Sequence, residues 1–262
     1  MHPFSHLKMI TEGAIARIVL ARPEVHNSFN GELIYELRTA FEATAADEAV
    51  RIVVLTGEGK SFCAGADLNY MKSMAAYGTR ENTKDARALS DMFVSIRSCP
   101  KPVIGRINGA AMGGGAGLVA ACDISIAAES ATFAFSEVKL GLVPAVISPY
   151  VIERIGPSAA RRLFMSGERF DAKFAERIGL IDQCVPDDIL DSVVAEQARQ
   201  LLTSGPLAVG EAKKLVEAVK TLSVEKMRMH AISKIADLRG SPEGHEGMSA
   251  FLEKRKPKWV VK

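Results

Sequence analysis

Short apolar runs alternate with helix-periodic segments through the first two thirds of the chain. Residues 51–56, RIVVLT, are apolar between their ends and stop at Gly57, which predicts a strand covered on both faces. Leu33, Leu37 and Phe41 recur every four residues after Asn30, so residues 30–46 predict an amphipathic helix that Asn30 caps. Further strands are predicted as a pair within 7–20, at 103–107 and at 124–127. Strands that alternate with helices predict an α/β core.

Helical periodicity dominates the chain from Pro157 onward. The predicted helices are interrupted by helix stops at Gly167, Gly179, Pro186, Gly205-Pro206 and Gly240-Ser241-Pro242. These helices are expected at 158–165, 171–178, 187–203, 206–220, 223–238 and 243–256. No linker or repeat divides the sequence, so we predict a core over residues 1–190 and a helical region with a basic tail over 191–262.

The amino-acid composition is typical of an ordinary globular protein. Its 262 residues are 48% apolar and 24% charged, and a net charge of +2 excludes a strongly basic nucleic-acid module. No run of about 18 apolar residues occurs, so no membrane span is predicted. The four cysteines (Cys63, Cys99, Cys122 and Cys184) form no CxxC pair. We therefore expect reduced thiols, a cytoplasmic location and no metal site.

The last twelve residues carry a local excess of positive charge. Five Lys or Arg side chains stand there against Glu253 alone. Such a cluster is typical of a solvated helix end whose charge complements the helix dipole, and phosphate binding is the alternative.

Several catalytic and nucleotide-binding motifs are nearly matched and fail. Gly59-Lys60-Ser61 resembles the end of a P-loop, but Val54 stands where that motif requires glycine. A GxGxxG frame from Gly113 meets Leu118 at its last position. Neither HExxH nor GxSxG occurs. ATP, dinucleotide, zinc-hydrolase and serine-hydrolase functions therefore lack support.

Two segments of small residues each follow a predicted buried strand, at 61–68 and 108–115. Both place nearly bare backbone just before a helix, where free N–H groups point outward and the helix dipole is positive. Such a pair can bind a developing oxyanion, since a Cβ would keep donors from approaching to about 2.7–3.1 Å. The alternative is that the glycines only allow close packing between layers.

Five segments carry a family resemblance. Their sequences are SFCAGADL, INGAAMGGGAGL, ACDISIAAESATFAFSEVKLGLVP, RLFMSGERFDAKFAERIGLID and EGMSAFLEKRKPKW. In order and spacing, from about residue 10 to the C-terminus, they resemble the crotonase family, also called the enoyl-CoA hydratase/isomerase family. The resemblance implies a core of repeated ββα turns that form a spiral, followed by a helical trimerisation region. It also implies assembly as a trimer or a dimer of trimers.

The resemblance also implies site residues. Ala66 and Gly114 match the positions whose N–H groups form an oxyanion hole for the thioester carbonyl, and Glu137 matches one of two catalytic glutamates. Coenzyme A, as part of the substrate and not a separate cofactor, would contact the loop after the first glycine segment, a nearby histidine and the tail of an adjacent subunit. Those residues are Ala64, Gly65, Asp67, Leu68, Asn69, His26, Phe251 and Lys254.

The chain departs from the two-glutamate hydratase pattern at Gly117. The second glutamate, which helps to hold the attacking water, would stand there. One carboxylate suffices for an isomerase that moves a double bond from C3–C4 to C2–C3. The segment PAVISPYVIERIG nevertheless resembles one-glutamate hydratases of branched or carboxylated enoyl-CoAs. We therefore expect an enoyl-CoA hydratase, with the isomerase as the alternative and a non-catalytic acyl-CoA-binding or RNA-associated relative as a further one.

Other polar residues near these motifs have simpler interpretations. Asp67 is expected to cap a helix, Asp123 to pair within the fold, and Cys63 to fill space. Ser148 and Tyr150 are candidates to line the acyl pocket and orient water in place of the missing glutamate.

Overall fold

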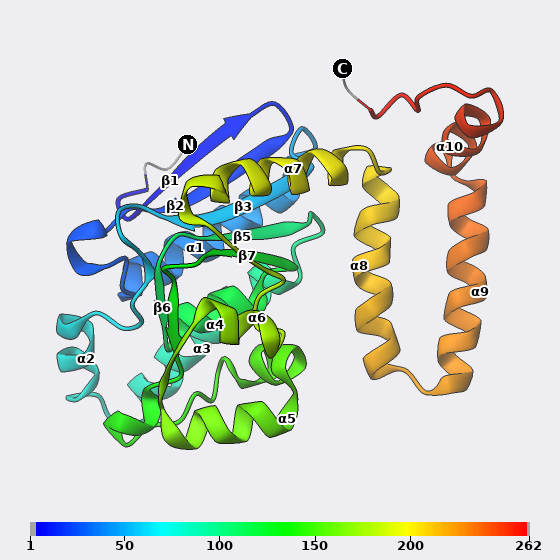
Figure 1. The fold of residues 1–262 in the computed structure, drawn as a ribbon. Helices are drawn as coiled ribbons and strands as arrows, with labels where there is room; N and C mark the ends of the chain where they lie inside the picture. The colour runs from blue at the N-terminus through cyan, green and yellow to red at the C-terminus, as the bar shows by residue number, and fades with distance from the viewer. Residues whose placement is uncertain (1–3, 261–262) are drawn as a thin grey trace.

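The computed structural model describes residues 4–260, and its strands form two sheets (Figure 1). The six-stranded sheet has the order β1-β2-β3-β5-β7-β10, parallel except for the antiparallel pair β1-β2. Its strands are β1 (Leu7–Glu12), β2 (Ile15–Leu20), β3 (Ile52–Gly57), β5 (Val103–Ile107), β7 (Ile124–Ala128) and β10 (Gln183–Val185). The four-stranded sheet has the order β4-β6-β8-β9, and its strands are β4 (Ser61–Cys63), β6 (Ala110–Met112), β8 (Thr132–Ala134) and β9 (Arg169–Asp171).

The chain builds these sheets as a spiral. Three times in succession it adds a strand to the larger sheet, then a strand to the smaller sheet, and then enters helices. The turns are β3-β4 followed by α2 (Leu68–Met74) and α3 (Thr79–Arg97), β5-β6 followed by α4 (Gly114–Ala121), and β7-β8 followed by α5 (Ser148–Ser166). The predicted α/β core of repeated ββα turns is confirmed.

The larger sheet is buried on both faces because its strands are apolar on both. In β3, Val53 and Leu55 point into the main core, whereas Ile52 and Val54 point to the opposite face. There they meet the helix α7 (Leu190–Leu202) through its buried side chains Leu190, Val194 and Ala198. The predicted boundary at residue 190 therefore falls at the start of a helix that packs on the core, and the chain leaves the core only after α7.

Most other helices follow the sequence pattern, but α3 and the first half of α5 were not predicted. Asn30 caps α1 (Gly31–Ala46) by accepting a hydrogen bond from Leu33 N at 2.8 Å. In α5, Gly156 is non-helical with φ at +70°, and the helical segment that follows it from Pro157 is the one predicted; the prediction missed the segment before the kink, from Ser148. Shorter helices are α6 (Ala172–Arg177), η1 (Pro23–Val25), η2 (Glu137–Leu140) and η3 (Asp187–Ile189).

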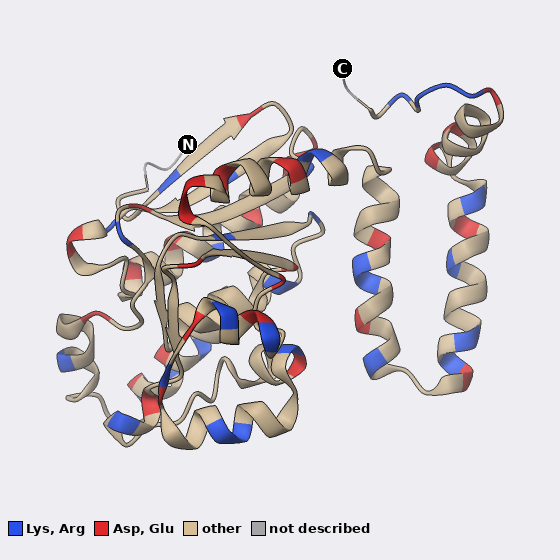
Figure 2. Ribbon diagram, in the orientation of Figure 1, with Lys and Arg blue, Asp and Glu red and all other residues tan. Residues whose placement is uncertain are grey.

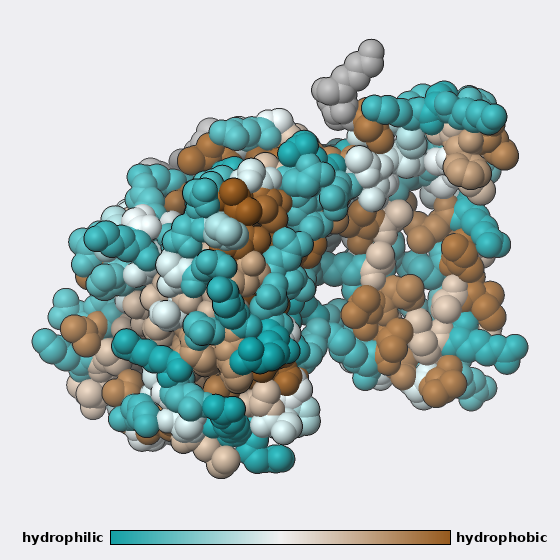
Figure 3. All heavy atoms as spheres, viewed as in Figure 1, coloured by the Kyte–Doolittle hydropathy of each residue, from teal (hydrophilic) through white to brown (hydrophobic). Residues whose placement is uncertain are grey.

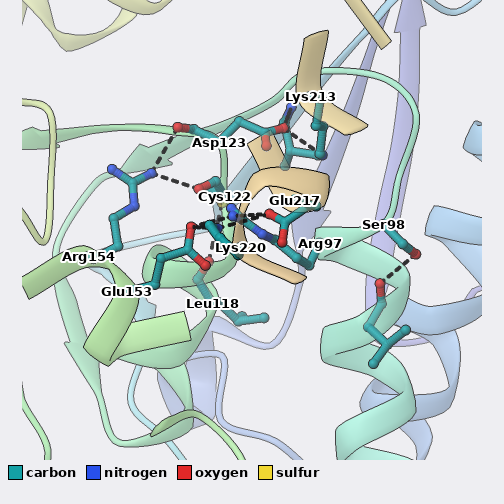
Figure 4. Close-up of polar contacts among 12 residues, drawn as sticks. Arg97, Ser98, Leu118, Cys122, Asp123, Glu153, Arg154, Lys213, Glu217 and Lys220 are labelled. Atoms are coloured by element: carbon teal, nitrogen blue, oxygen red, sulfur yellow. Dashed lines mark hydrogen bonds and ion pairs between the residues drawn. The ribbon is translucent and has the colours of Figure 1, made fainter. Parts of the chain in front are cut away.

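Three C-terminal helices form an arm beside the core: α8 (Pro206–Thr221), α9 (Val224–Gly240) and α10 (Pro242–Leu252) (Figure 1). Charged residues are spread along α8 and α9 (Figure 2). Ion pairs join α8 to the core: Lys213 Nζ lies 2.7 Å from Asp123, and Arg97 bridges Glu153 and Glu217 (Figure 4). Asp123 thus pairs within the fold, as predicted.

The arm exposes apolar side chains that the core does not cover (Figure 3). On α8 and α9 they include Val216, Val219, Val224, Met229, Ile232 and Ile235. Within residues 4–260, no helix combines the length and apolar character needed to cross a bilayer.

Candidate active site

Two strands of the smaller sheet end in turns that lie against each other. β4 and β6 pair in parallel, and a glycine with positive φ follows each: Gly65 at +91° and Gly113 at +50°. A Cβ on Gly65 would lie 3.0 Å from the carbonyl oxygen of Met112, and one on Gly115 would lie 2.0 Å from that of Cys63. Close packing of the two turns therefore requires a glycine at positions 65 and 115, and this requirement does not depend on any ligand.

The backbone N–H groups of Ala66 and Gly114 are left free beside these turns. Phe29 N donates to Gly65 O at 2.7 Å, and Phe29 O accepts from Asp67 N at 2.8 Å, which fixes Ala66 between two bonded neighbours. Gly114 is the first residue of α4, where an N–H has no carbonyl one turn back. Within the described part of the chain, neither N–H donates a hydrogen bond. Two donors near a helix start are thus available to an acceptor.

Glu137 brings a carboxylate to the same turns. It is the first residue of η2, and its Oε1 lies 3.1 Å from the point that a Cβ on Gly113 would occupy. Its Oε2 is buried and has no hydrogen-bond partner among residues 4–260. Burial raises the pKa of the Glu137 carboxyl above its ordinary value, because an apolar environment disfavours the charged form. The side chain therefore binds a proton more readily than a solvated glutamate.

A cavity of about 370 Å³ opens onto the free amides and Glu137. Its walls are mostly apolar and come from α1 to α3 and from the segment between η2 and α5. The apolar side chains that line it include Phe29, Ile34, Met71, Met74, Leu89, Met112, Leu140, Leu142, Val143, Val146 and Ile147. A ligand with an apolar chain and one carbonyl group suits this combination of walls and donors.

Apolar packing fills the space beside Gly117. A Cβ built there would lie 2.3 Å from Ile147 Cγ2 and 3.1 Å from Phe93 Cζ. A larger side chain at residue 117 would need both neighbours to move, so this side of the cavity has no second carboxylate and no room for one.

The residues predicted to contact coenzyme A divide into two groups, of which the first lies near the cavity. Ala64 and Gly65 line it. Asp67 is buried beside it and caps α2, as predicted, by accepting from Asn69 N at 2.8 Å, and it also pairs with Arg22 at 2.9 Å. Although burial opposes ionisation, these partners lower the pKa of Asp67. Its carboxylate is therefore already bonded within the protein.

The other residues near the first turn face outward. His26 Nδ1 lies 3.0 Å from Ser61 Oγ, and His26 itself has a positive φ of 55°. Leu68 and Asn69 are exposed at the start of α2. In the described part of the chain, the side chains of these three residues do not line the cavity. They could therefore contact only a part of the ligand that extends outside the cavity.

The second group lies at the end of the arm. Phe251 is 83% exposed near the end of α10, and Lys254 is exposed just beyond it. In one chain this end of the arm is on the far side of the molecule from α2 (Figure 1). The structure of a single chain therefore does not bring Phe251 or Lys254 to the cavity.

Three further predictions concerned neighbouring residues. Ser148 and Tyr150 do not line the cavity: Ser148 Oγ donates to Ala145 O at 2.8 Å, and Tyr150 stacks on Phe93 at 5.5 Å. Their predicted role in orienting water is thus unsupported. Cys63 is buried, and burial raises the pKa of its thiol to about 12, which agrees with a packing role.

Sequence reasoning missed several residues that line the cavity. Ile147, Tyr70 and Asp85 come from separate helices or their caps and carry no motif. Only the folded chain brings them to one cavity, so no local pattern could have identified them.

The model of the family described as enoyl-CoA hydratase/isomerase matches residues 10–262. This chain belongs to that family. Membership makes it an enzyme of the lyase or isomerase type. The crotonyl-CoA hydratase of Syntrophomonas wolfei subsp. wolfei is 34% identical over 99% of both chains. The 1,2-epoxyphenylacetyl-CoA isomerase of Escherichia coli is 33% identical over 96% of this chain and 97% of its own.

Solved structures of family members show the same fold. A crystal structure of an enoyl-CoA hydratase from Shewanella pealeana superposes with a TM-score of 0.94 at 38% identity, covering 98% of this chain and 96% of the other. The match includes the C-terminal helices, so the arm is part of the family architecture.

Proposed function

We propose that this enzyme is an enoyl-CoA hydratase, which adds water across the C2–C3 double bond of an acyl-CoA thioester. The observation that carries the proposal is the position of Glu137: its unpartnered Oε2 and the free N–H groups of Ala66 and Gly114 adjoin one apolar cavity. A base and two oxyanion donors at one end of an acyl-sized cavity are what this addition requires.

The chemistry follows from the thioester. Its carbonyl oxygen accepts hydrogen bonds from Ala66 N and Gly114 N. Glu137 takes a proton from water as the water oxygen bonds to C3, and the displaced π electrons move to form an enolate on the carbonyl oxygen. The protonated Glu137 then returns the proton to C2. Each amide is worth about 2.7–4 kcal/mol of barrier, because the oxygen gains charge only in this step.

The coenzyme A part of the substrate extends from the cavity mouth in this proposal. Ala64 to Asn69 and His26 contact its adenine end, and the apolar and basic tail of a neighbouring chain supplies Phe251 and Lys254. This requires self-association, as a trimer or a dimer of trimers. The exposed apolar side chains of α9, including Met229, Ile232 and Ile235, support it because an apolar face of this kind is normally covered. Four free cysteine thiols support a reducing, cytoplasmic location.

A second candidate is the isomerisation of 3-enoyl-CoA to 2-enoyl-CoA. The observation that favours it is Ile147 beside Gly117, which leaves Glu137 without a second carboxylate to hold the water. One base can remove a proton from C2 to give a dienolate, whose oxygen the same two amides would bind, and return the proton to C4 as the double bond moves to C2–C3.

The test is to incubate the purified protein with crotonyl-CoA and with 3-hexenoyl-CoA, and to follow the products by mass spectrometry and by the ultraviolet absorbance of the conjugated enoyl thioester. A hydratase adds the mass of one water to crotonyl-CoA, whereas an isomerase gives a conjugated product of unchanged mass from 3-hexenoyl-CoA only. A protein that binds both substrates and converts neither is a non-catalytic relative.

Glu137→Gln should lower kcat by about 10²- to 10⁴-fold, because the general base is lost. The exposed Glu12→Gln, in β1, is the matched control and should have no effect. Wild-type kcat/KM should fall as the pH drops through the pKa of Glu137, since only the ionised carboxylate accepts a proton, and that acid limb should lie above the ordinary glutamate range. Full activity in Glu137→Gln would refute the proposal.

A further inference from the structure

Phe29 sets the direction of the free Ala66 N–H. The two residues form an isolated β-bridge, in which Phe29 N donates to Gly65 O at 2.7 Å. The Gly65 carbonyl and the Ala66 N–H belong to one planar trans peptide group, and they point in opposite directions. The hydrogen bond from Phe29 therefore holds the Ala66 N–H in one direction.

The backbone just before Phe29 has an unusual conformation. His26 and Asn27 both have positive φ, at 55° and 56°, a region that residues other than glycine rarely occupy. Such a conformation persists only where its surroundings hold it. Arg22 holds it at two points: its backbone N–H donates to Asn27 Oδ1 at 2.9 Å, and its Nη1 donates to Ser28 O at 2.5 Å. Arg22 thus fixes the chain that leads into Phe29.

The same guanidinium binds the residue that follows Ala66. Arg22 Nη2 lies 2.9 Å from Asp67 Oδ2, and the two side chains are only 12% and 8% exposed. The other carboxylate oxygen of Asp67 caps α2. Arg22 therefore joins the two sides of the β-bridge, at Ser28 and at Asp67, through one rigid planar group.

The ion pair also balances a charge that would oppose the proposed reaction. Negative charge develops on the thioester oxygen at the Ala66 N–H, and the Asp67 carboxylate belongs to the next residue. Like charges repel more strongly in a buried, apolar environment than in water. Without Arg22, the Asp67 carboxylate would disfavour the enolate that the amide stabilises.

Resting on the proposed function, we propose that Arg22 is a positioning residue, which acts on the enolate oxygen through Ala66 and Asp67. Its guanidinium fixes the direction of the Ala66 N–H and neutralises the Asp67 carboxylate. Among the described residues, Arg22 is not part of the cavity lining, so it does not touch the acyl group. Its loss should therefore lower kcat and leave substrate binding nearly unchanged.

The test measures how strongly the bound carbonyl is polarised. Hydrogen bonds to a thioester oxygen lower the C=O stretching frequency, which infrared difference spectroscopy records for butyryl-CoA labelled with carbon-13 at the carbonyl. Butyryl-CoA has no double bond, so this signal does not depend on hydration. Turnover of crotonyl-CoA, measured separately, reports the proposed reaction.

The wild-type protein should lower the stretching frequency on binding, and Arg22→Gln should lose more than half of this shift. The same variant should lower kcat for crotonyl-CoA at least tenfold while KM changes less than threefold. Arg154→Gln is the matched control. Arg154 is 14% exposed, pairs with Asp182 at 2.9 Å and donates to two backbone carbonyls, but it binds no residue of the two turns (Figure 4). Its loss should leave the shift and kcat unchanged.

Asp67→Asn tests the ion pair from its other side, and it also serves if Arg22→Gln does not fold. It keeps an oxygen that can cap α2 and removes the charge that binds Arg22, so it should also reduce the shift. Because the two side chains act as one unit, the double variant should lose no more of the shift than Arg22→Gln alone.

Equal shifts in the wild type, Arg22→Gln and Asp67→Asn would overturn this proposal and leave the proposed function in place. So would additive losses in the double variant, and so would loss of butyryl-CoA binding in Arg22→Gln, since Arg22 would then support the fold alone. The expected shifts without any turnover of crotonyl-CoA would count against the hydratase and still support the role of Arg22.

Discussion

The core and the C-terminal arm are built from similar helices but stabilised in different ways. In the core, both faces of the larger sheet are covered, and five phenylalanines are fully buried. In the arm, α9 has no buried residue, and the contacts of α8 with the core include the ion pairs of Lys213 and Glu217. The core thus completes its apolar packing within one chain, whereas the arm leaves its apolar side chains exposed.

Because of this difference, the residues proposed for catalysis and those proposed for self-association lie in different regions of the chain. Glu137 and the free amides come from turns held by backbone packing in the core, so their geometry does not depend on the arm. The arm presents Phe251 and Lys254, which a single chain does not bring to the cavity. A site completed by a neighbouring chain would follow from this division.

The largest effect should come from truncating a core aromatic ring. Phe133 is 0% exposed and Phe251 is 83% exposed. Phe133→Ala should lower the free energy of unfolding by about 3–5 kcal/mol, because it leaves a cavity. Phe251→Ala should change it by less than about 0.5 kcal/mol. Urea unfolding followed by circular dichroism gives both values, and equal losses would contradict the contrast between core and arm.

An intermediate effect should come from the ion pair that joins the arm to the core. Lys213 and Asp123 are both mostly buried, so Lys213→Met should lower the free energy of unfolding by about 1–3 kcal/mol, since the Asp123 carboxylate loses its basic partner. Lys214 next to it is 64% exposed, and Lys214→Met should cost less than about 0.5 kcal/mol. Similar losses in the two variants would show that the pair does not hold the arm.

The smallest effect should appear in association and not in folding. Ile232→Asp places a charge in the exposed apolar face of α9 and should weaken self-association at least tenfold, about 1.4 kcal/mol. Ile10→Asp, on an exposed strand of the core, should not weaken it. Sedimentation velocity over a dilution series gives the comparison. If the wild-type protein stays monomeric at all concentrations, the arm has no role in self-association and the prediction is wrong.

The parts of the fold that could be predicted from the sequence are those set by local physical chemistry. The apolar run of β3, the spacing of Leu33 and Leu37 and the caps at Asn30 and Asp67 all act within one element. The helical segment from Pro157 was also predicted, because proline suits a helix start, whereas the segment of α5 before the non-helical Gly156 was missed.

The site could be predicted only where it carries a family resemblance. Ala66, Gly114 and Glu137 lie in quoted segments, and the structure adds that the two amides are free and Glu137 Oε2 lacks a partner. Ile147 and Asp85 enter the cavity from distant elements, so their positions depend on tertiary packing that no local pattern records.

The most direct test of the central claim is a crystal structure of Glu137→Gln with bound crotonyl-CoA. The thioester oxygen should lie about 2.7–3.1 Å from both Ala66 N and Gly114 N, with C3 of the acyl group facing the side chain of residue 137. A thioester oxygen out of hydrogen-bond reach of both amides, or an acyl chain outside the cavity, would contradict the account.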